Sequence, residues 1–197
     1  MTRSRLTITL GFIVTLAASA GVNIVQAQRI HALLDVGYPS SIVGRQAPPL
    51  IGFSLDGARK EIPLRGGLPT IVYFFRSTCG WCEQNWANME AIHAAARGRY
   101  RLVVTSSERR LHDFIRDRHL TVDVLEGLDD GVRLALGFSA PPHTIAVSSD
   151  GQVTHEWRGA YTPRIERQIE DALDVFLPGL QIQPSAGALA QSKYPAE

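Results

Sequence analysis

The chain has 197 residues, which suits one domain with appended segments, because domains usually contain roughly 100–200 residues. Its composition is that of an ordinary globular protein, with 45% hydrophobic and 20% charged residues. The formal net charge of +1 provides no basic field, so nucleic acid is not a predicted partner.

The N-terminal segment, residues 1–27, has a basic start followed by a long apolar stretch. Arg3 and Arg5 are its only charges, and residues 6–25 are mostly apolar. As a helix, this stretch would be about 30 Å long, which is the thickness of the bilayer hydrocarbon. It predicts a single-pass anchor in the cytoplasmic membrane with the domain on the periplasmic side. The alternative is a signal peptide that is cleaved after Val25-Gln26-Ala27, leaving a secreted periplasmic protein.

The next part of the chain predicts a linker followed by strands. Residues 28–42 are interpreted as a linker, which overlaps a Pro-, Ser- and Gly-rich stretch at residues 38–49. Residues 50–64 predict a β-hairpin that turns at Asp56-Gly57. The continuous β-prone sequence TIVYFF, residues 70–75, predicts a buried strand. A helix is expected over residues 82–97 and a further strand over residues 100–107.

The second half continues the alternation of helices and strands. Helices are predicted over residues 108–120 and 129–137, and a hairpin over residues 143–157. A last helix should begin after Thr162 and run to about residue 177. Residues 178–197 are predicted to be a disordered tail. Together these elements indicate an α/β domain over residues 43–177, with a mixed central sheet and helices on both faces.

The strongest functional signal is a CxxC pair, Cys79 and Cys82, the only cysteines in the chain. A loop this short closes too little chain to stabilise a fold as a structural disulfide. The pair follows a predicted buried strand, and Cys82 is expected to open a helix. Free N–H groups at the start of a helix stabilise a thiolate. The placement therefore predicts a thioredoxin-like redox centre.

Other roles for the cysteines are less consistent with the sequence. A structural zinc site needs four ligands, and neither another cysteine nor an HxxxH pair with His93 exists. Haem attachment needs a histidine where Glu83 stands. Copper carriage through two thiolates and a histidine stays open, as do two inert buried thiols. The sequence predicts no metal site and no cofactor.

The motifs resemble the membrane-anchored thioredoxin-like thiol-disulfide oxidoreductases of the TlpA/ResA type, within the wider redoxin group. Residues 44–82 resemble the family's first hairpin, strand and active site, and residues 137–153 resemble the segment with its cis-proline. In the family this proline precedes the hairpin glycine by nine residues, as Pro142 precedes Gly151 here. The resemblance implies a thioredoxin-like fold with an added N-terminal β-hairpin, and a cis peptide bond at Pro142 close to the cysteines.

The resemblance also implies a mechanism and a set of partners. Cys79 would be the nucleophile and Cys82 the resolving thiol in exchange with protein thiols and disulfides. An upstream redox donor would serve the pair, in the maturation of cytochrome c or other exported redox proteins. The residues expected to contact substrate are Trp81, Pro141, Pro142 and His143. The alternatives are an ordinary strand role for the histidine and, for the whole protein, a copper-binding chaperone or scaffold.

Several positions around the dithiol depart from the family pattern. Thr78 and Phe75 stand where the family usually has tryptophans. Arg76, three residues before Cys79, stands where peroxiredoxins have a threonine, which disfavours a peroxidase. Tyr73 occupies the place where thioredoxins have a buried acid for the resolving thiol. Asn85 replaces a second carboxylate of the family, which leaves Glu83 as the nearest acid in sequence. The usual proton shuttle is therefore expected to be missing or relocated.

Overall fold

The computed structural model describes residues 13, 15–29, 40–117 and 122–181, which fall into two separate units divided after Ser40. In the first unit, residues 15–29 are helical. The predicted apolar stretch, residues 6–25, lies partly outside the described residues. Among the described residues, no helix is both long and apolar enough to cross a membrane.

The second unit is built on a five-stranded mixed sheet with the strand order β5-β4-β3-β6-β7. The central strand β3 (Thr70–Phe74) pairs in parallel with β4 (Arg101–Thr105) and antiparallel with β6 (His143–Val147). The edge strands are β5 (Asp123–Leu125) and β7 (Val153–Arg158). Every residue of β3 is buried, as its unbroken apolar sequence predicted.

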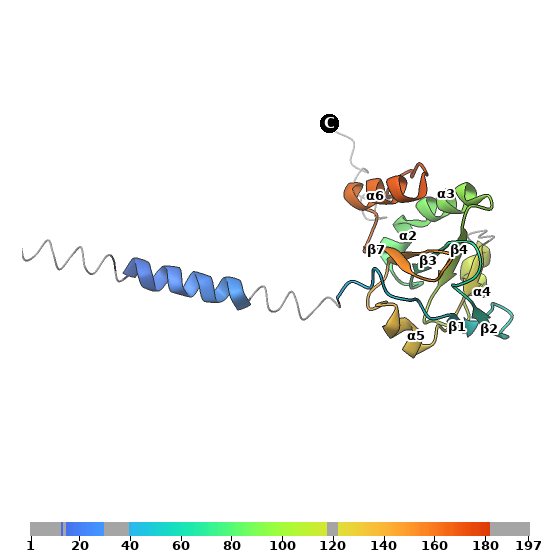
Figure 1. Ribbon diagram of the computed structural model, residues 1–197, viewed down its shortest axis with the longest axis horizontal. Helices are drawn as coiled ribbons and strands as arrows, with labels where there is room; N and C mark the ends of the chain where they lie inside the picture. Colours follow the sequence, from blue (N-terminus) through green and yellow to red (C-terminus); the bar gives the residue numbers. More distant parts are fainter. Residues whose placement is uncertain (1–12, 14, 30–39, 118–121, 182–197) are drawn as a thin grey trace, which may run out of the picture. The chain divides into compact units, whose positions relative to one another are not determined.

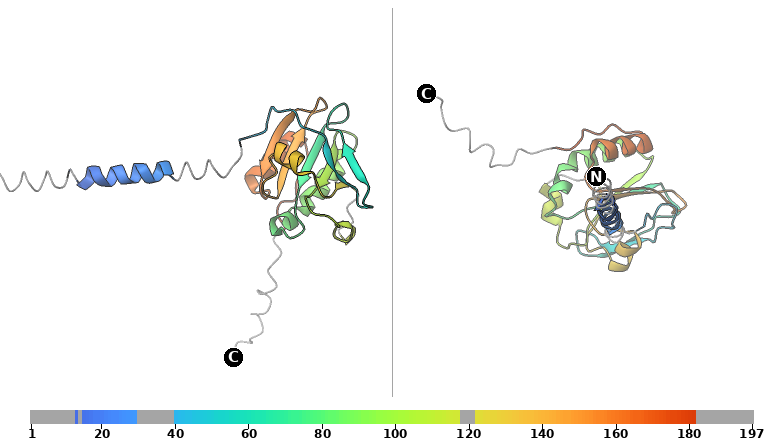
Figure 2. Two further views of the ribbon diagram at one scale, coloured as in Figure 1. Left: turned by 90° about the horizontal axis from the view of Figure 1, so that it is seen from below. Right: turned by 90° about the vertical axis from the view of Figure 1, so that its left-hand side faces the viewer.

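Helices cover both faces of this sheet (Figure 1). One face carries α2 (Gly80–Gln84), α3 (Trp86–Ala96), α4 (His112–Asp117) and α6 (Pro163–Leu173). The other face carries α5 (Asp130–Ala135) and the separate hairpin of β1 (Leu50–Phe53) and β2 (Arg59–Ile62). Figure 2 shows these layers from two further sides. The predicted α/β architecture with an added hairpin is confirmed.

The sheet separates two hydrophobic cores, because successive side chains of a strand point to opposite faces. Tyr73 faces α3, where its ring meets the edge of Trp86 at a centroid distance of 5.9 Å. Phe74 faces the other way and stacks on Phe138 at 5.0 Å. The dithiol belongs to the first core, since Cys82 is buried there.

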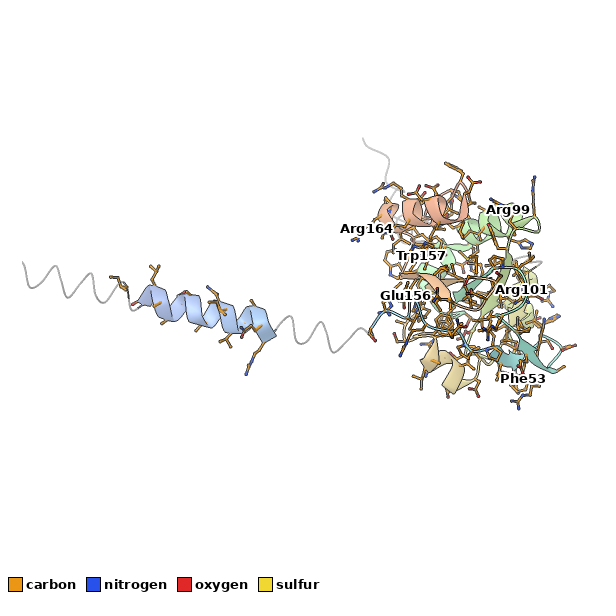
Figure 3. All side chains as sticks on the ribbon, in the orientation of Figure 1. Phe53, Arg99, Arg101, Glu156, Trp157 and Arg164 are labelled. Carbon is orange, nitrogen blue, oxygen red and sulfur yellow. A yellow bond between two sulfur atoms is a disulfide. The ribbon has the colours of Figure 1, made fainter. Side chains whose placement is uncertain are left out.

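The stretch that leads into the domain packs along the β6–β7 hairpin. Ile42 is buried, and its N–H donates to Glu156 Oε2 at 3.2 Å. The N–H of Gly44 donates to the carbonyl of Val153 at 2.8 Å. Figure 3 shows the labelled Glu156 and Trp157 on β7, the second on the side of α6. Ile42 and Gly44 are therefore held against β7 by burial and hydrogen bonds.

The helix predicted over residues 82–97 is two helices, which is a correction. Asn85 separates α2 from α3 with φ −89° and ψ −7°. The first helix begins at Gly80, so Cys79 is its N-cap, and Cys82 lies inside the helix. The break follows from the buried side chain of Asn85, which is bound by the distant Tyr161 N–H.

Smaller differences occur elsewhere in the domain. The helix predicted over residues 108–120 begins only at His112, because Arg110 has a φ of +64°, which no α-helix accommodates. Residues 118–121 lie outside the described part of the chain. The short strand β5 was not predicted at all. Thr162 does precede α6, but its side chain makes no capping hydrogen bond.

Candidate redox site

Cys79 and Cys82 are joined by a disulfide bond, with their Cα atoms 5.2 Å apart. The two sulfurs differ in their surroundings. Cys82 is only 1% exposed, whereas Cys79 is partly exposed. Cys79 also caps α2: its Sγ accepts the N–H of Cys82 at 3.1 Å. One sulfur can therefore meet a partner at the surface, and the other can act only from behind it.

The loop before Cys79 is held by a carboxylate that the sequence did not indicate. Glu108, which follows β4, accepts the backbone N–H of Ser77 at 2.6 Å and its hydroxyl at 3.1 Å. The N–H of Glu108 itself donates to Ser106 Oγ at 3.1 Å. These bonds fix the loop between β3 and α2 from the neighbouring strand. No local signal identifies Glu108, because Ser77 lies 31 residues earlier.

Trp81 lies between the two cysteines and is 57% exposed. A large indole that is this exposed, in the first turn of α2, contributes little to the core. Aromatic side chains in such positions are typical of contacts with a partner. The exposure is consistent with the predicted contact, and the role of Trp81 in substrate binding remains a prediction.

The peptide bond between Pro141 and Pro142 is cis, as predicted. Pro142 is buried and immediately precedes β6, whose first residue, His143, pairs with Phe74 at the end of β3. Because β3 and β6 are antiparallel, Pro142 and the loop toward Cys79 lie at the same end of the sheet. Pro141 is partly exposed and has no N–H to offer a substrate.

His143 does not share the cysteines' face of the sheet. Its ring packs against Phe138 at a centroid distance of 5.1 Å, and its Nε2 lies 3.1 Å from Glu156 Oε1. Burial lowers the pKa of His143 to about 4, against the raising effect of Glu156, while Arg158 lowers it further. A neutral histidine on the face opposite the cysteines is consistent with a structural role in β6 rather than with a contact to substrate.

A layer of buried polar groups lies in the core that contains Cys82. Asn85 Oδ1 accepts the N–H of Tyr161 at 3.2 Å and Asn88 Nδ2 at 3.4 Å. Tyr161 Oη shares a hydrogen bond of 2.7 Å with Thr144 Oγ1. All four side chains are almost inaccessible. Sequence reasoning missed Tyr161 and Thr144, whose partners lie too far along the chain for any local pattern to reveal.

Tyr73 stands in the same core but cannot accept a proton near neutral pH. Burial raises the pKa of its phenol well above 10, and the nearby Tyr161 and Glu83 raise it further, although the Asn85 amide lowers it. Among the described residues, neither Tyr73 Oη nor Asn85 Nδ2 has a hydrogen-bond partner of normal geometry. The side chain of Glu83, the residue after Cys82 on α2, is half-buried. It is the acid that α2 itself supplies.

The described residues contain no group of three or more histidine, cysteine or acidic side chains that could hold a metal ion. In particular, His143 at the start of β6 packs against Phe138, which belongs to the core on the other face of the sheet. The geometry of the site is therefore that of a cysteine pair with polar neighbours.

No family model and no curated protein sequence matches the chain. Solved structures do match its fold. The thioredoxin domain of a thiol-disulfide oxidoreductase from Bacteroides vulgatus is similar with a TM-score of 0.57 and 19% identity, over 68% of this chain and 99% of that one. A thiol:disulfide interchange protein of the thioredoxin family from Chlorobium tepidum gives a TM-score of 0.53 and 19% identity, over 68% and 99%.

A secreted disulfide oxidoreductase from Mycobacterium tuberculosis, described as homologous to E. coli DsbE, gives a TM-score of 0.51 and 16% identity, over 63% of this chain and 93% of that one. Identities this low establish the fold alone. The chain thus has a thioredoxin-like α/β fold, in which Cys79 caps α2 and Cys82 lies in its first turn.

Proposed function

We propose that this protein is a thiol-disulfide oxidoreductase that exchanges disulfides with protein cysteines. One observation carries the proposal: a partly exposed Cys79 sulfur is bonded to a buried Cys82 sulfur beside the exposed Trp81. The asymmetry suits a two-step exchange, in which the outer sulfur meets the partner and the inner sulfur completes the reaction. The names of the similar structures support the same reading.

The reducing direction illustrates the steps. The Cys79 thiolate attacks one sulfur of a substrate disulfide, forming a mixed disulfide and releasing the other substrate sulfur as a thiolate. The Cys82 thiolate then attacks Cys79 Sγ, which releases the second substrate thiolate and closes the Cys79–Cys82 bond. Two electrons pass from the protein to the substrate, and an upstream dithiol donor restores the reduced pair. The oxidising direction is the reverse.

A trapping experiment tests this proposal. Cys82→Ser leaves Cys79 without its resolving partner, so mixed disulfides with substrate proteins should accumulate and disappear on reduction. Cys79→Ser is the matched control and should trap little, because Cys82 is buried. Equal trapping by the two variants, or none by either, would contradict a two-step exchange through Cys79.

We further propose that residues 6–25 hold the domain at the cytoplasmic membrane, on its periplasmic side, where it would serve the maturation of cytochrome c or other exported redox proteins. The support is the apolar sequence behind Arg3 and Arg5. Cell fractionation tests the tether: the intact chain should sediment with membranes and resist carbonate extraction. A shorter, soluble periplasmic form would instead support the cleaved signal peptide.

A further inference from the structure

A buried hydrogen-bond network connects the dithiol helix to residues 177–181, the C-terminal segment of the described chain. Asn85, at the break between α2 and α3, accepts the N–H of Tyr161 and the amide of Asn88 through one oxygen. Asn88 Oδ1 in turn accepts the N–H of Gly179 at 3.0 Å. Both asparagines are 0% exposed. Buried bonds of this kind are costly to leave unmade.

The network also reaches the cis-proline. The turn after β7 contains Gly159 and Tyr161, and the Gly159 N–H donates to the carbonyl of Pro142 at 2.8 Å. Tyr161 Oη bonds Thr144, two residues beyond Pro142 on β6. A single turn therefore contacts both the cis-proline strand and the α2–α3 break.

The C-terminal segment also bonds the dithiol helix directly. The N–H of Gln181 donates to the carbonyl of Gln84, the last residue of α2, at 3.1 Å. Leu177 is 1% exposed and belongs to the same core as Cys82. Because α2 has only five residues, a movement of its last turn also moves Cys82 and the N–H that Cys79 Sγ accepts.

We propose that Asn88 is a positioning residue for the dithiol: by joining Asn85 to Gly179, it holds the C-terminal segment against α2 and keeps α2 aligned with the cis-proline. The inference rests on the proposed exchange function of the same site. In the oxidised protein, the bond between Cys79 and Cys82 itself constrains the start of α2. In the reduced protein this covalent constraint is absent, so the position of α2 depends more on the hydrogen-bond network. Loss of the network should therefore destabilise the reduced form more than the oxidised form.

The test compares Asn88→Leu with the full unmodified chain and with Leu128→Ala. Asn88→Leu removes both hydrogen bonds at a similar side-chain volume. Leu128→Ala destabilises the other core by leaving a cavity, without touching the network. Each protein is equilibrated with glutathione, and its fraction of disulfide is measured. For Asn88→Leu, we expect an equilibrium shift toward the disulfide of about threefold, or roughly 15 mV to more negative potential. Leu128→Ala should leave the equilibrium unchanged.

A second variant covers the case in which Asn88→Leu does not fold. Gln181→Pro removes the N–H that the Gln84 carbonyl accepts, at an exposed residue, and leaves the Asn85 and Asn88 side chains in place. It should shift the equilibrium in the same direction by a smaller factor. An unchanged equilibrium in Gln181→Pro, or equal shifts in Asn88→Leu and Leu128→Ala, would overturn the positioning role. An unmodified protein whose cysteines do not exchange at all would overturn the proposed function instead, so the two failures are distinguishable.

Discussion

The backbone N–H of Cys82 donates to Cys79 Sγ across 3.1 Å, so the buried cysteine supports the sulfur of the exposed one. A hydrogen bond to the charged form of a group stabilises that form. In the reduced protein, the negative charge should therefore settle on Cys79. This relationship underlies the roles assigned to the two cysteines.

The first prediction concerns the reactivity of the two thiols. Iodoacetamide should modify Cys79 of the reduced protein first. The pH at which this rate is half-maximal should lie below the ordinary thiol pKa of about 8.5. Mass spectrometry of peptides identifies the modified residue. In Cys79→Ser, the remaining buried Cys82 should react on the order of tenfold more slowly. Modification of Cys82 before Cys79 would reverse the assignment.

The second prediction concerns Trp81, whose exposed indole can contact a protein partner but is not needed by a small thiol. Trp81→Ala should slow exchange with a protein disulfide about fivefold or more, in line with the loss of an aromatic contact. Exchange with dithiothreitol should change less than about twofold. Trp81→Phe is the control and should keep most of the activity toward protein. Equal losses toward both substrates would show that the indole acts on the dithiol itself.

The third prediction concerns Glu83 as the proton acceptor for Cys82. Tyr73 stays protonated because burial raises its pKa, so the candidate to take the proton is Glu83, the half-buried acid that follows Cys82 on α2. Glu83→Gln should slow the resolution of a preformed mixed disulfide on the order of tenfold or more near pH 7. The deficit should shrink at higher pH, where hydroxide deprotonates the thiol.

Stopped-flow release of a labelled thiol from Cys79 measures the Glu83→Gln effect. Glu90→Gln is a matched control, because Glu90 is an exposed acid on α3. A uniform deficit at every pH would indicate a structural effect of the substitution and exclude Glu83 as the base.

The fourth prediction concerns stability between pH 4 and 6.5. Burial lowers the pKa of His143 to about 4, whereas a histidine in the unfolded chain titrates near 6.5. Below pH 6.5 the unfolded state therefore binds more protons, and stability falls as the pH falls toward 4. The loss attributable to His143 is on the order of 3 kcal/mol. Urea denaturation measures the free energy of unfolding of the unmodified protein and of His143→Gln. The variant should lose less of this free energy as the pH falls from 6.5 to 4.

The carboxylate of Glu156, beside His143, also affects the pH dependence of stability. Burial would raise the pKa of Glu156, but hydrogen bonds from Arg158, Ser41 and Ile42 outweigh it and hold the pKa below 4.5. Its contribution to stability is present above that value and is lost at lower pH. An equally steep loss between pH 6.5 and 5 in His143→Gln and the unmodified protein would contradict the role given to His143.

The sequence predicted those features that short patterns encode. The apolar run of β3, the turn signals of the two hairpins and the spacing from Pro142 to Gly151 are all local. So is the CxxC pair, and its predicted placement after a buried strand is confirmed. Each of these depends on residues fewer than ten positions apart, and the role of the proline spacing came from the family resemblance.

What the sequence could not predict depends on contacts between distant residues. The break at Asn85 needs Tyr161, which is 76 residues away. Strand β5 has only three residues and is defined by its pairing with β4. A segment this short has no hydrophobic periodicity from which it could be predicted. His143 follows Pro142 in the sequence and was therefore expected near the cysteines. The alternation of side chains along β6 instead places it on the opposite face of the sheet, against Phe138.

The most direct measurement of the central claim is a redox titration of the Cys79–Cys82 pair. The protein is equilibrated in glutathione buffers, and its free thiols and its tryptophan fluorescence, to which Trp81 contributes, are followed together. The account predicts one reversible two-electron transition that both signals report, and no such transition in Cys82→Ser. Thiols that stay unreactive in every buffer, or tight Cu(I) binding without exchange, would contradict it.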